Sequence, residues 1–144
     1  MDPIPPAKKR SLIFFGFALI FLAAVVAILY SLNAWDAPAS ARRLPNPVPV
    51  TESAIDEGMF AYSQHCKSCH GDNGDGKGER AHELSVMPTN FTNAGQMSRL
   101  TDGELFWKIT HGRRPMPAFE NKLTPTERWQ VVDYIRTFAK QSHP

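Results

Sequence analysis

Residues 66–70 read Cys-Lys-Ser-Cys-His, in a chain of 144 residues that contains only these two cysteines. Two residues separate Cys66 from Cys69, and His70 follows directly. With this spacing each thiol can add to one vinyl group of a haem while the adjacent imidazole reaches the iron. The motif therefore predicts one covalently bound haem c, with Cys66, Cys69 and His70 as its binding residues.

Three other kinds of site use paired cysteines, and each fits this stretch less well. A thioredoxin-like redox pair lies beside a βαβ pattern, which this sequence lacks. A structural zinc site needs four ligands, and the other histidines stand at no recognised zinc spacing from the cysteines. A single structural disulfide would account for both thiols but would leave the position of His70 unexplained.

Residues 51–144 contain several helical patterns and no convincing alternation of the kind that a strand shows. A first helix is expected over 51–65, with Thr51 or Ser53 as its N-cap and acidic residues in its first turn. So few helices bury little apolar surface, and a domain of this size is marginal unless something else fills its core. A bound cofactor would fill it.

Two capping boxes, Thr101–Glu104 and Thr124–Glu127, predict the starts of two further helices. The second box has proline at the first helical position. The helix that follows it carries apolar residues at helical spacing, which predicts a buried face made of Trp129, Val132, Ile135 (or Tyr134) and Phe138.

Three segments together resemble class I cytochrome c, and they occur in the order found in that family. They are Gly58–Gly71, Gly112–Phe119 and Trp129–Phe138, so the resemblance covers about residues 52–140. The resemblance implies a small all-α fold, the class I cytochrome c fold, wrapped around one haem. It also implies that the first helix of the domain crosses the last at close range.

The resemblance assigns contact positions to this helix crossing. Gly58 and Tyr62 match positions on the first helix, and Tyr134 matches the aromatic residue on the last. A glycine at such a position lets two backbones approach each other.

The sixth ligand of the iron must come from another part of the chain, and the resemblance implies Met116. The flanking Pro115 and Pro117 fix their own φ angles, which makes the peptide stiff and suited to presenting a thioether. Without the resemblance, a surface loop with an adaptable methionine would explain the same residues. Other candidates for this ligand remain: Met87 (also followed by a proline), Met97, His82 and His111.

A glycine-rich stretch, Gly71–Gly78, follows the haem motif. Its four glycines permit positive φ angles and close passage over a flat macrocycle. A calcium loop is the competing interpretation, but Gly74 stands where an EF-hand places its second oxygen ligand.

Residues 11–32 are predicted to form a single transmembrane anchor. From Leu12 to Leu32 the chain carries no charge, and a helix of this length spans roughly 30 Å, the thickness of the hydrocarbon core. The basic cluster Lys8-Lys9-Arg10 favours a cytoplasmic N-terminus for residues 1–10. A cleaved secretory signal is the alternative, because Ala39-Ser40-Ala41 offers a cleavage site, but the apolar run is longer than the 7–15 residues usual in signals.

Residues 33–50 are predicted to form a proline-rich spacer before the cytochrome c domain of residues 51–144. Prolines that alternate with other residues favour an extended polyproline II conformation. At about 3.1 Å per residue, such a spacer reaches at most roughly 50 Å.

The charge of the chain limits the classes of partner. A formal charge of +2 excludes a strongly basic nucleic-acid-binding protein. Residues 44–144 carry 11 basic and 12 acidic residues, which argues against strong long-range steering. The adjacent Arg113 and Arg114 are candidates for pairing with haem propionates or for a docking rim.

The resemblance implies a one-electron carrier rather than an enzyme, tethered as a mediator or subunit of a respiratory or photosynthetic complex. Its partners would be redox proteins in the membrane, and its haem domain would lie on the periplasmic face of a bacterial cytoplasmic membrane. A haem enzyme or gas-binding sensor with an open distal site is the main alternative. Such a protein would need a polar distal group such as His82 or His111. A structural subunit whose haem never turns over is a third possibility.

Overall fold

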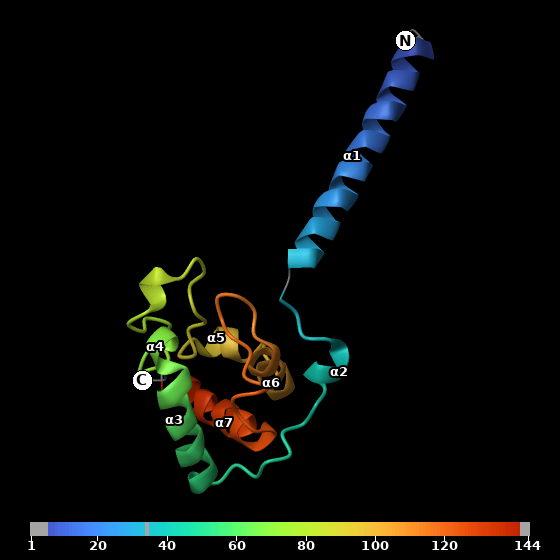
Figure 1. Cartoon of the computed structure of the whole chain (residues 1–144). Coiled ribbons are helices and arrows are strands. Elements are labelled where there is room, and N and C mark those ends of the chain that lie inside the picture. The colour runs from blue at the N-terminus through green and yellow to red at the C-terminus, as the bar shows by residue number, and fades with distance from the viewer. Residues whose placement is uncertain (1–5, 34, 142–144) are drawn as a thin grey trace. The chain divides into compact units, whose positions relative to one another are not determined.

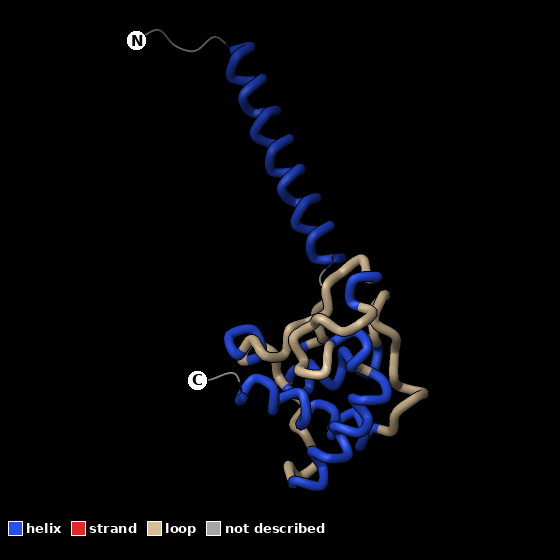
Figure 2. The backbone as a smooth tube through the Cα atoms, turned by 90° about the vertical axis from the view of Figure 1, so that its left-hand side faces the viewer, coloured by secondary structure: helices blue, strands red, loops and turns tan. Residues whose placement is uncertain are grey.

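The computed structural model describes residues 6–33 and 35–141, and every regular element within them is a helix. Figure 2 shows these helices joined by loops, with no strand drawn in the described parts. The all-α prediction is therefore confirmed for the described residues. The ends of two predicted segments, 1–5 of the N-terminus and 142–144 of the domain, lie outside them.

Helix α1 (Pro6–Asn33) belongs to a first compact unit that ends at Trp35. Its side chains are described from Phe14 to Leu29, and the large apolar ones among them are exposed, for example Phe14, Phe15 and Phe21. In the part of the chain that the structure describes, no helix combines the length and the hydropathy needed to cross a membrane. The anchor expected over residues 11–32 stays a prediction.

A second compact unit begins at Asp36. Figure 1 labels its main helices in chain order. Their bounds are α2 (Ala39–Arg42), α3 (Glu52–His65), α4 (Lys67–His70), the short 3₁₀ helix η1 (Ala81–Glu83), α5 (Ala94–Met97), α6 (Asp102–His111) and α7 (Pro125–Gln141).

Helices α3 and α7, green and red in Figure 1, lie against each other although they are far apart in the sequence. At the contact, a Cβ added to Gly58 would meet the backbone carbonyl of Gln130 and lie 3.1 Å from the Cβ of Tyr134. The Tyr62 and Tyr134 rings meet edge to face with their centroids 5.3 Å apart. The helix crossing implied by the resemblance is confirmed, with a glycine where no side chain fits.

Each of the three helices expected from the sequence begins at a threonine cap. The Oγ1 atoms of Thr51 and Thr101 accept hydrogen bonds from backbone N–H groups three residues later, both at 3.1 Å. At α7 the box is reciprocal, because Thr124 N donates to the carboxylate of Glu127 at 2.7 Å and Glu127 N donates to Thr124 Oγ1 at 3.2 Å. These side chains satisfy N–H groups that a helix leaves unpaired in its first turn.

Much of the segment expected to be a spacer packs on the domain. Ala37 is only 2% exposed. The Asn46 side-chain amide donates to the carboxylate of Asp133 on α7 at 2.8 Å. A Cβ added to Gly103 on α6 would lie 2.7 Å from the carbonyl oxygen of Leu44. A small residue on α6 and a polar anchor on α7 therefore hold this segment, whereas its proline content predicts a semi-rigid, extended spacer.

The core of the second unit is one cluster of buried side chains, called the core cluster below. Four of its members come from the buried face predicted on α7, which is confirmed: Trp129, Val132, Ile135 and Phe138 are each at most 6% exposed. The other members are Ala61, Tyr62, Phe91, Met97, Leu105, Ile109, Phe119, Leu123 and Val131.

Candidate functional site

The cysteines of the haem motif lie at the junction of α3 and α4. Cys66 follows the last residue of α3, and its N–H donates to the carbonyl of Tyr62 at 2.8 Å. Helix α4 then carries Cys69 and His70, and His70 N donates to the Cys66 carbonyl at 2.9 Å. Both thiols are free and half-buried. A single turn of helix therefore presents two thiols and one imidazole together.

The His70 ring has a fixed hydrogen-bond partner. Its Nδ1 lies 3.3 Å from the carbonyl oxygen of Thr89, and a carbonyl can only accept, so Nδ1 carries the proton and donates. The other ring nitrogen, Nε2, is then the one with a free lone pair. Burial lowers the pKa of His70, and the bond to Thr89 offsets this only in part. The neutral imidazole that results is the form that ligates a metal.

A phenyl ring covers one face of this imidazole. The rings of His70 and Phe91 are stacked, with centroids 4.6 Å apart and planes 14° from parallel. Phe91 is 6% exposed and belongs to the core cluster.

The glycine-rich stretch folds back onto the motif. Gly71 has φ +84°, and its carbonyl accepts a hydrogen bond from the Tyr62 hydroxyl at 2.8 Å. Gly76 N donates to the His70 carbonyl at 2.8 Å. Among the described residues, no group of three or more histidine, cysteine, aspartate or glutamate side chains is placed to hold a metal ion.

Burial also changes the acidity of the first cysteine. Burial, and to a smaller extent the electrostatic influence of the neighbouring Cys69, raise the pKa of the Cys66 thiol to about 12. The Cys66 thiol is therefore protonated at neutral pH.

Met116 lies in a tight turn at the edge of the core. Its backbone and that of Arg113 exchange two hydrogen bonds, of 2.8 and 3.0 Å, which close the turn. The Met116 side chain is half-buried and packs against the core cluster, as does Cys66. The thioether and the first thiol thus lie against the same body of side chains.

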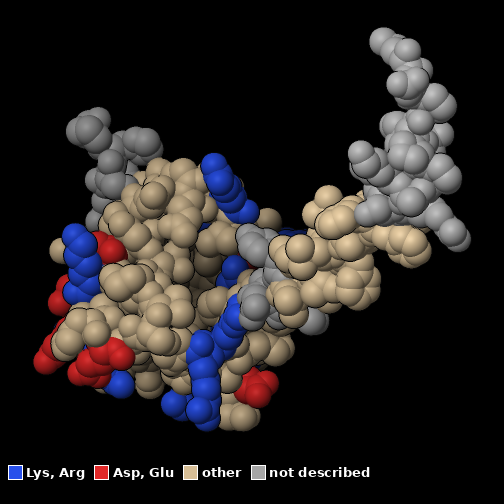
Figure 3. All heavy atoms as spheres, turned by 90° about the horizontal axis from the view of Figure 1, so that it is seen from above, with Lys and Arg blue, Asp and Glu red and all other residues tan. Residues whose placement is uncertain are grey.

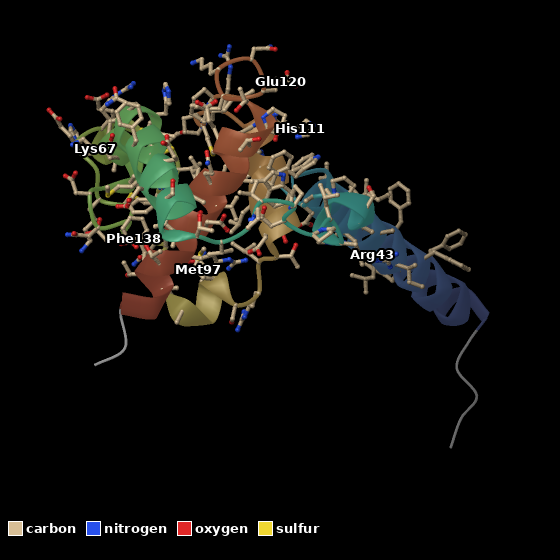
Figure 4. The ribbon with its side chains drawn as sticks, turned by 90° about the horizontal axis from the view of Figure 1, so that it is seen from below. Arg43, Lys67, Met97, His111, Glu120 and Phe138 are labelled. Atoms are coloured by element: carbon tan, nitrogen blue, oxygen red, sulfur yellow. The ribbon has the colours of Figure 1, made fainter. Side chains whose placement is uncertain are left out.

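The other candidate ligands lie in different surroundings. Met87 is 67% exposed, whereas Met97 is 1% exposed inside the core cluster. His82 and His111 are exposed, and the His111 ring stacks on Trp107 at 4.6 Å. In Figure 4, His111 and Glu120 lie at one end of the domain and Met97 lies at the other. Burial favours Met116 over Met87, while Met97 is occupied as a core side chain.

Charged side chains are spread unevenly over the domain. In Figure 3, Lys and Arg side chains border a hollow in the face that is seen from above, while Asp and Glu side chains gather mostly along one margin. Arg113 and Arg114, which precede Met116, are both exposed.

Two residues of the site are not apparent from the sequence motif. Thr89 contributes its backbone carbonyl, which no side-chain pattern reveals, and Phe91 is one of nine phenylalanines in the chain. The segment Met87–Asn93 stands out in the sequence only for its Met-Pro pair. This Met-Pro pair does not identify Thr89 or Phe91 as residues of the site.

The chemistry of these donors fits a c-type haem. Two unpaired thiols stand three positions apart, the imidazole Nε2 is free to bind iron, and a thioether lies against the same core.

Comparison with known proteins agrees with this chemistry. The family model described as cytochrome c oxidase, cbb3-type, subunit III matches residues 53–135, more than half of the chain. Cytochrome c6 of Euglena viridis is 25% identical over 87 residues, which are 57% of this chain and 90% of that protein. Cytochrome c6 of Anabaena variabilis is 28% identical over 78 residues, with 54% and 84% of the two chains covered.

One relative is much longer than this chain. The dehydrogenase subunit of alcohol dehydrogenase (quinone) from Acetobacter aceti is 44% identical over 102 residues, which are 67% of this chain. These residues make up only 12% of the relative's length, so the likeness concerns one segment of that protein.

Solved structures of similar fold include a c-type cytochrome and a reducing HAO-like protein complex. The KustC0563 c-type cytochrome has a TM-score of 0.51 and 33% identity, covering 56% of this chain and 95% of its own. The Kuenenia stuttgartiensis reducing HAO-like protein complex Kustc0457/Kustc0458 has a TM-score of 0.57 and 26% identity, with 66% and 49% covered. This chain therefore belongs to the cytochrome c family, in the group that the cbb3-type subunit III model describes, and it carries covalently bound haem c.

Proposed function

We propose that this protein is a one-electron carrier whose haem is attached to Cys66 and Cys69 and ligated by His70 and Met116. When bound, the haem supplies an iron that changes oxidation state by one electron without making a bond to a substrate. The work of the polypeptide is to hold both axial ligands, to orient the imidazole and to exclude water from the iron.

The observation that carries this proposal is the hydrogen bond from His70 Nδ1 to the Thr89 carbonyl, at 3.3 Å. It leaves Nε2 as the metal-binding nitrogen and makes the imidazole a stronger donor. The half-buried Met116 would supply a weakly donating thioether as the second ligand. Ligation by one histidine and one methionine raises the reduction potential above that of two histidines.

The optical spectrum of the native full-length protein tests this proposal. Met-ligated ferric haem gives a weak charge-transfer band that disappears when the thioether leaves, so we expect that band and slow reaction with cyanide. Rapid binding of cyanide by the ferric form, or of carbon monoxide by the ferrous form, would instead indicate an open site. Such a result would favour a haem enzyme or gas sensor and would contradict the carrier.

We further propose that residues 11–32 anchor the protein in a bacterial cytoplasmic membrane, with the haem domain on the periplasmic face. The uncharged run from Leu12 to Leu32 is longer than Phe14–Leu29, the part of α1 whose side chains are described. Within that part, nearly all large apolar side chains are exposed. The basic residues of 8–10 support the orientation.

The partner of this carrier is proposed to be a redox complex in the same membrane, of the respiratory or photosynthetic kind. The names of the relatives support this, since one is a subunit of a quinone-linked dehydrogenase and one structure is an HAO-like complex. Native purification in mild detergent should recover the haem protein together with its partner.

Alkaline washing of membranes tests the anchor, and protease treatment of spheroplasts tests its orientation. We expect the haem to stay in the washed membrane fraction and the haem domain to be digested by protease added outside. Release by the wash would contradict the anchor, while a haem domain digested only after lysis would contradict the orientation.

A further inference from the structure

We propose that Phe91 is a positioning residue that sets the plane of the axial imidazole of His70. This inference rests on the proposed ligation of the haem iron by His70, and it adds a determinant that the ligand motif does not contain. The evidence is the stacking of the two rings, with centroids 4.6 Å apart and planes 14° from parallel.

The two contacts of the His70 ring restrict different motions. The hydrogen bond to Thr89 O fixes which nitrogen is protonated and ties one edge of the ring to the backbone. A single hydrogen bond of 3.3 Å still allows the ring plane to turn about an axis through that contact. A phenyl ring stacked on the face blocks this turn, because a rotated imidazole would press its edge into Phe91.

Phe91 can act in this way because it is itself held in place. Its side chain is 6% exposed and is part of the core cluster. Its backbone N–H donates to the carbonyl of Gly74 at 2.7 Å. Asn90 stiffens the same segment, since its side-chain oxygen accepts hydrogen bonds from Thr92 N at 2.9 Å and from Thr92 Oγ1 at 2.7 Å.

One short segment therefore supplies both constraints on the ligand. Thr89 holds the edge of the imidazole and Phe91 holds its face, with only Asn90 between them. Together they leave the ring one orientation relative to the domain, and hence one orientation about the bond to the iron.

The plane of an axial imidazole has a measurable effect in a low-spin ferric haem. Together with the orientation of the other ligand, it decides how the unpaired electron is distributed over the porphyrin. It therefore affects the order of the four haem-methyl signals in the proton NMR spectrum and the spread of the electron paramagnetic resonance g-values. A change at a residue that only stabilises the fold would not move these signals.

The experiment compares four forms of the full-length ferric protein: wild type, Phe91→Leu, Phe91→Tyr and Phe106→Leu. Phe106 is the control, because it is a phenylalanine that packs against the core cluster and its ring contacts Trp129 and Arg128 on α7. We expect Phe91→Leu to change the order of the methyl signals or to produce a second set of g-values. Phe91→Tyr keeps a flat ring and should restore the wild-type pattern, and Phe106→Leu should retain it.

Two outcomes overturn the proposal. One is a Phe91→Leu protein whose methyl order and g-values equal those of wild type, and the other is a Phe106→Leu protein that shows the same change as Phe91→Leu. If Phe91→Leu does not accumulate as holoprotein, Phe91→Ile decides by the same two readouts. Failure of the proposed function would be seen separately, in a wild-type protein without the low-spin spectrum of histidine-ligated iron.

Discussion

The segments that supply the two proposed axial ligands are built differently. On the histidine side, the His70 ring is held by a backbone carbonyl and by a stacked phenyl ring, both from residues 89–91. On the methionine side, Met116 sits in a turn closed by two backbone hydrogen bonds, with its side chain only half-buried. The histidine is therefore fixed at its side chain, whereas the methionine is fixed mainly at its backbone. Exchange of the ligand should begin on the methionine side.

Removal of His70 should have the largest effect. In His70→Ala the thiols remain, but the iron loses its nitrogen ligand and the contacts of the imidazole with Thr89 and Phe91 vanish. We expect little holoprotein and no low-spin spectrum from the protein that forms, measured by haem staining of denaturing gels and by absorption. A normal yield with an unchanged spectrum would show that the nitrogen ligand is not His70.

Removal of Met116 should have a smaller effect that is confined to the other side of the iron. Met116→Ala should keep the covalent haem, lose the charge-transfer band and bind cyanide rapidly, and its reduction potential should fall. Met87→Ala is the control, since Met87 is 67% exposed and should leave spectrum and potential unchanged. If the band persists in Met116→Ala and disappears in Met87→Ala, the ligand is Met87.

A substitution that strains the backbone of the turn around Met116 should weaken the binding of Met116 to the iron without removing the side chain. Gly112 has φ +59°, and a Cβ there would meet the backbone of Pro117 and Ala118. For Gly112→Ala we expect a cost of about 1–2 kcal/mol, because φ +59° with ψ 176° is a backbone conformation that essentially only glycine adopts. A turn destabilised by this amount should be open roughly ten times more often. Cyanide should therefore bind roughly tenfold faster at equal haem content.

Gly95→Ala is the matched control for that substitution. Gly95 lies in α5, and its added Cβ would come no closer than 3.5 Å to Asn93 Oδ1. Its cyanide rate should equal that of wild type. Equal rates in Gly112→Ala and Gly95→Ala would show that the turn does not control access to the iron.

The smallest expected effect concerns the capping box that Thr124 and Glu127 form at the start of α7. Hydrogen bonds from Thr124 N and from its hydroxyl lower the pKa of Glu127 below its ordinary value of 4.5. Because the folded-state pKa is lowered, this stabilisation is present above pH 4.5 and is lost as the pH falls through the lowered value. Glu127→Ala should cost about 0.5–1 kcal/mol at neutral pH.

Denaturant unfolding at several pH values measures this difference. The difference in free energy of unfolding between wild type and Glu127→Ala should narrow as the pH drops below 4.5. Glu120→Ala is the control, because it removes an exposed carboxylate outside α7 and should leave the stability at neutral pH equal to that of wild type. A gap that is constant from pH 7 to strongly acidic conditions would rule out the carboxylate as the acceptor.

The sequence predicts α3, α6 and α7 well because each of these three helices is specified locally. Thr51, Thr101 and Thr124 are side-chain caps that depend only on residues three positions away. The buried face of α7 follows from helical spacing, and Gly58 is recognised from the family resemblance. The motif Cys66–His70 likewise carries its chemistry within five residues.

The parts that could not be predicted depend on contacts across the fold. The Thr89 carbonyl and the Phe91 ring act on His70 from 19 and 21 positions away, and a backbone carbonyl leaves no trace in a sequence pattern. The prolines of the segment before α3 predict a semi-rigid, extended spacer. Asn46 attaches it to Asp133, 87 positions away, through a hydrogen bond that only the folded chain brings together.

The crossing of α3 and α7 has a consequence for the order in which the chain matures. Gln130 and Tyr134, which close on Gly58, are synthesised more than seventy residues after it, and closing so long a loop is slow. The thiols at 66 and 69 belong to the part of the chain that is made first, so they are synthesised before α7 can pack on α3.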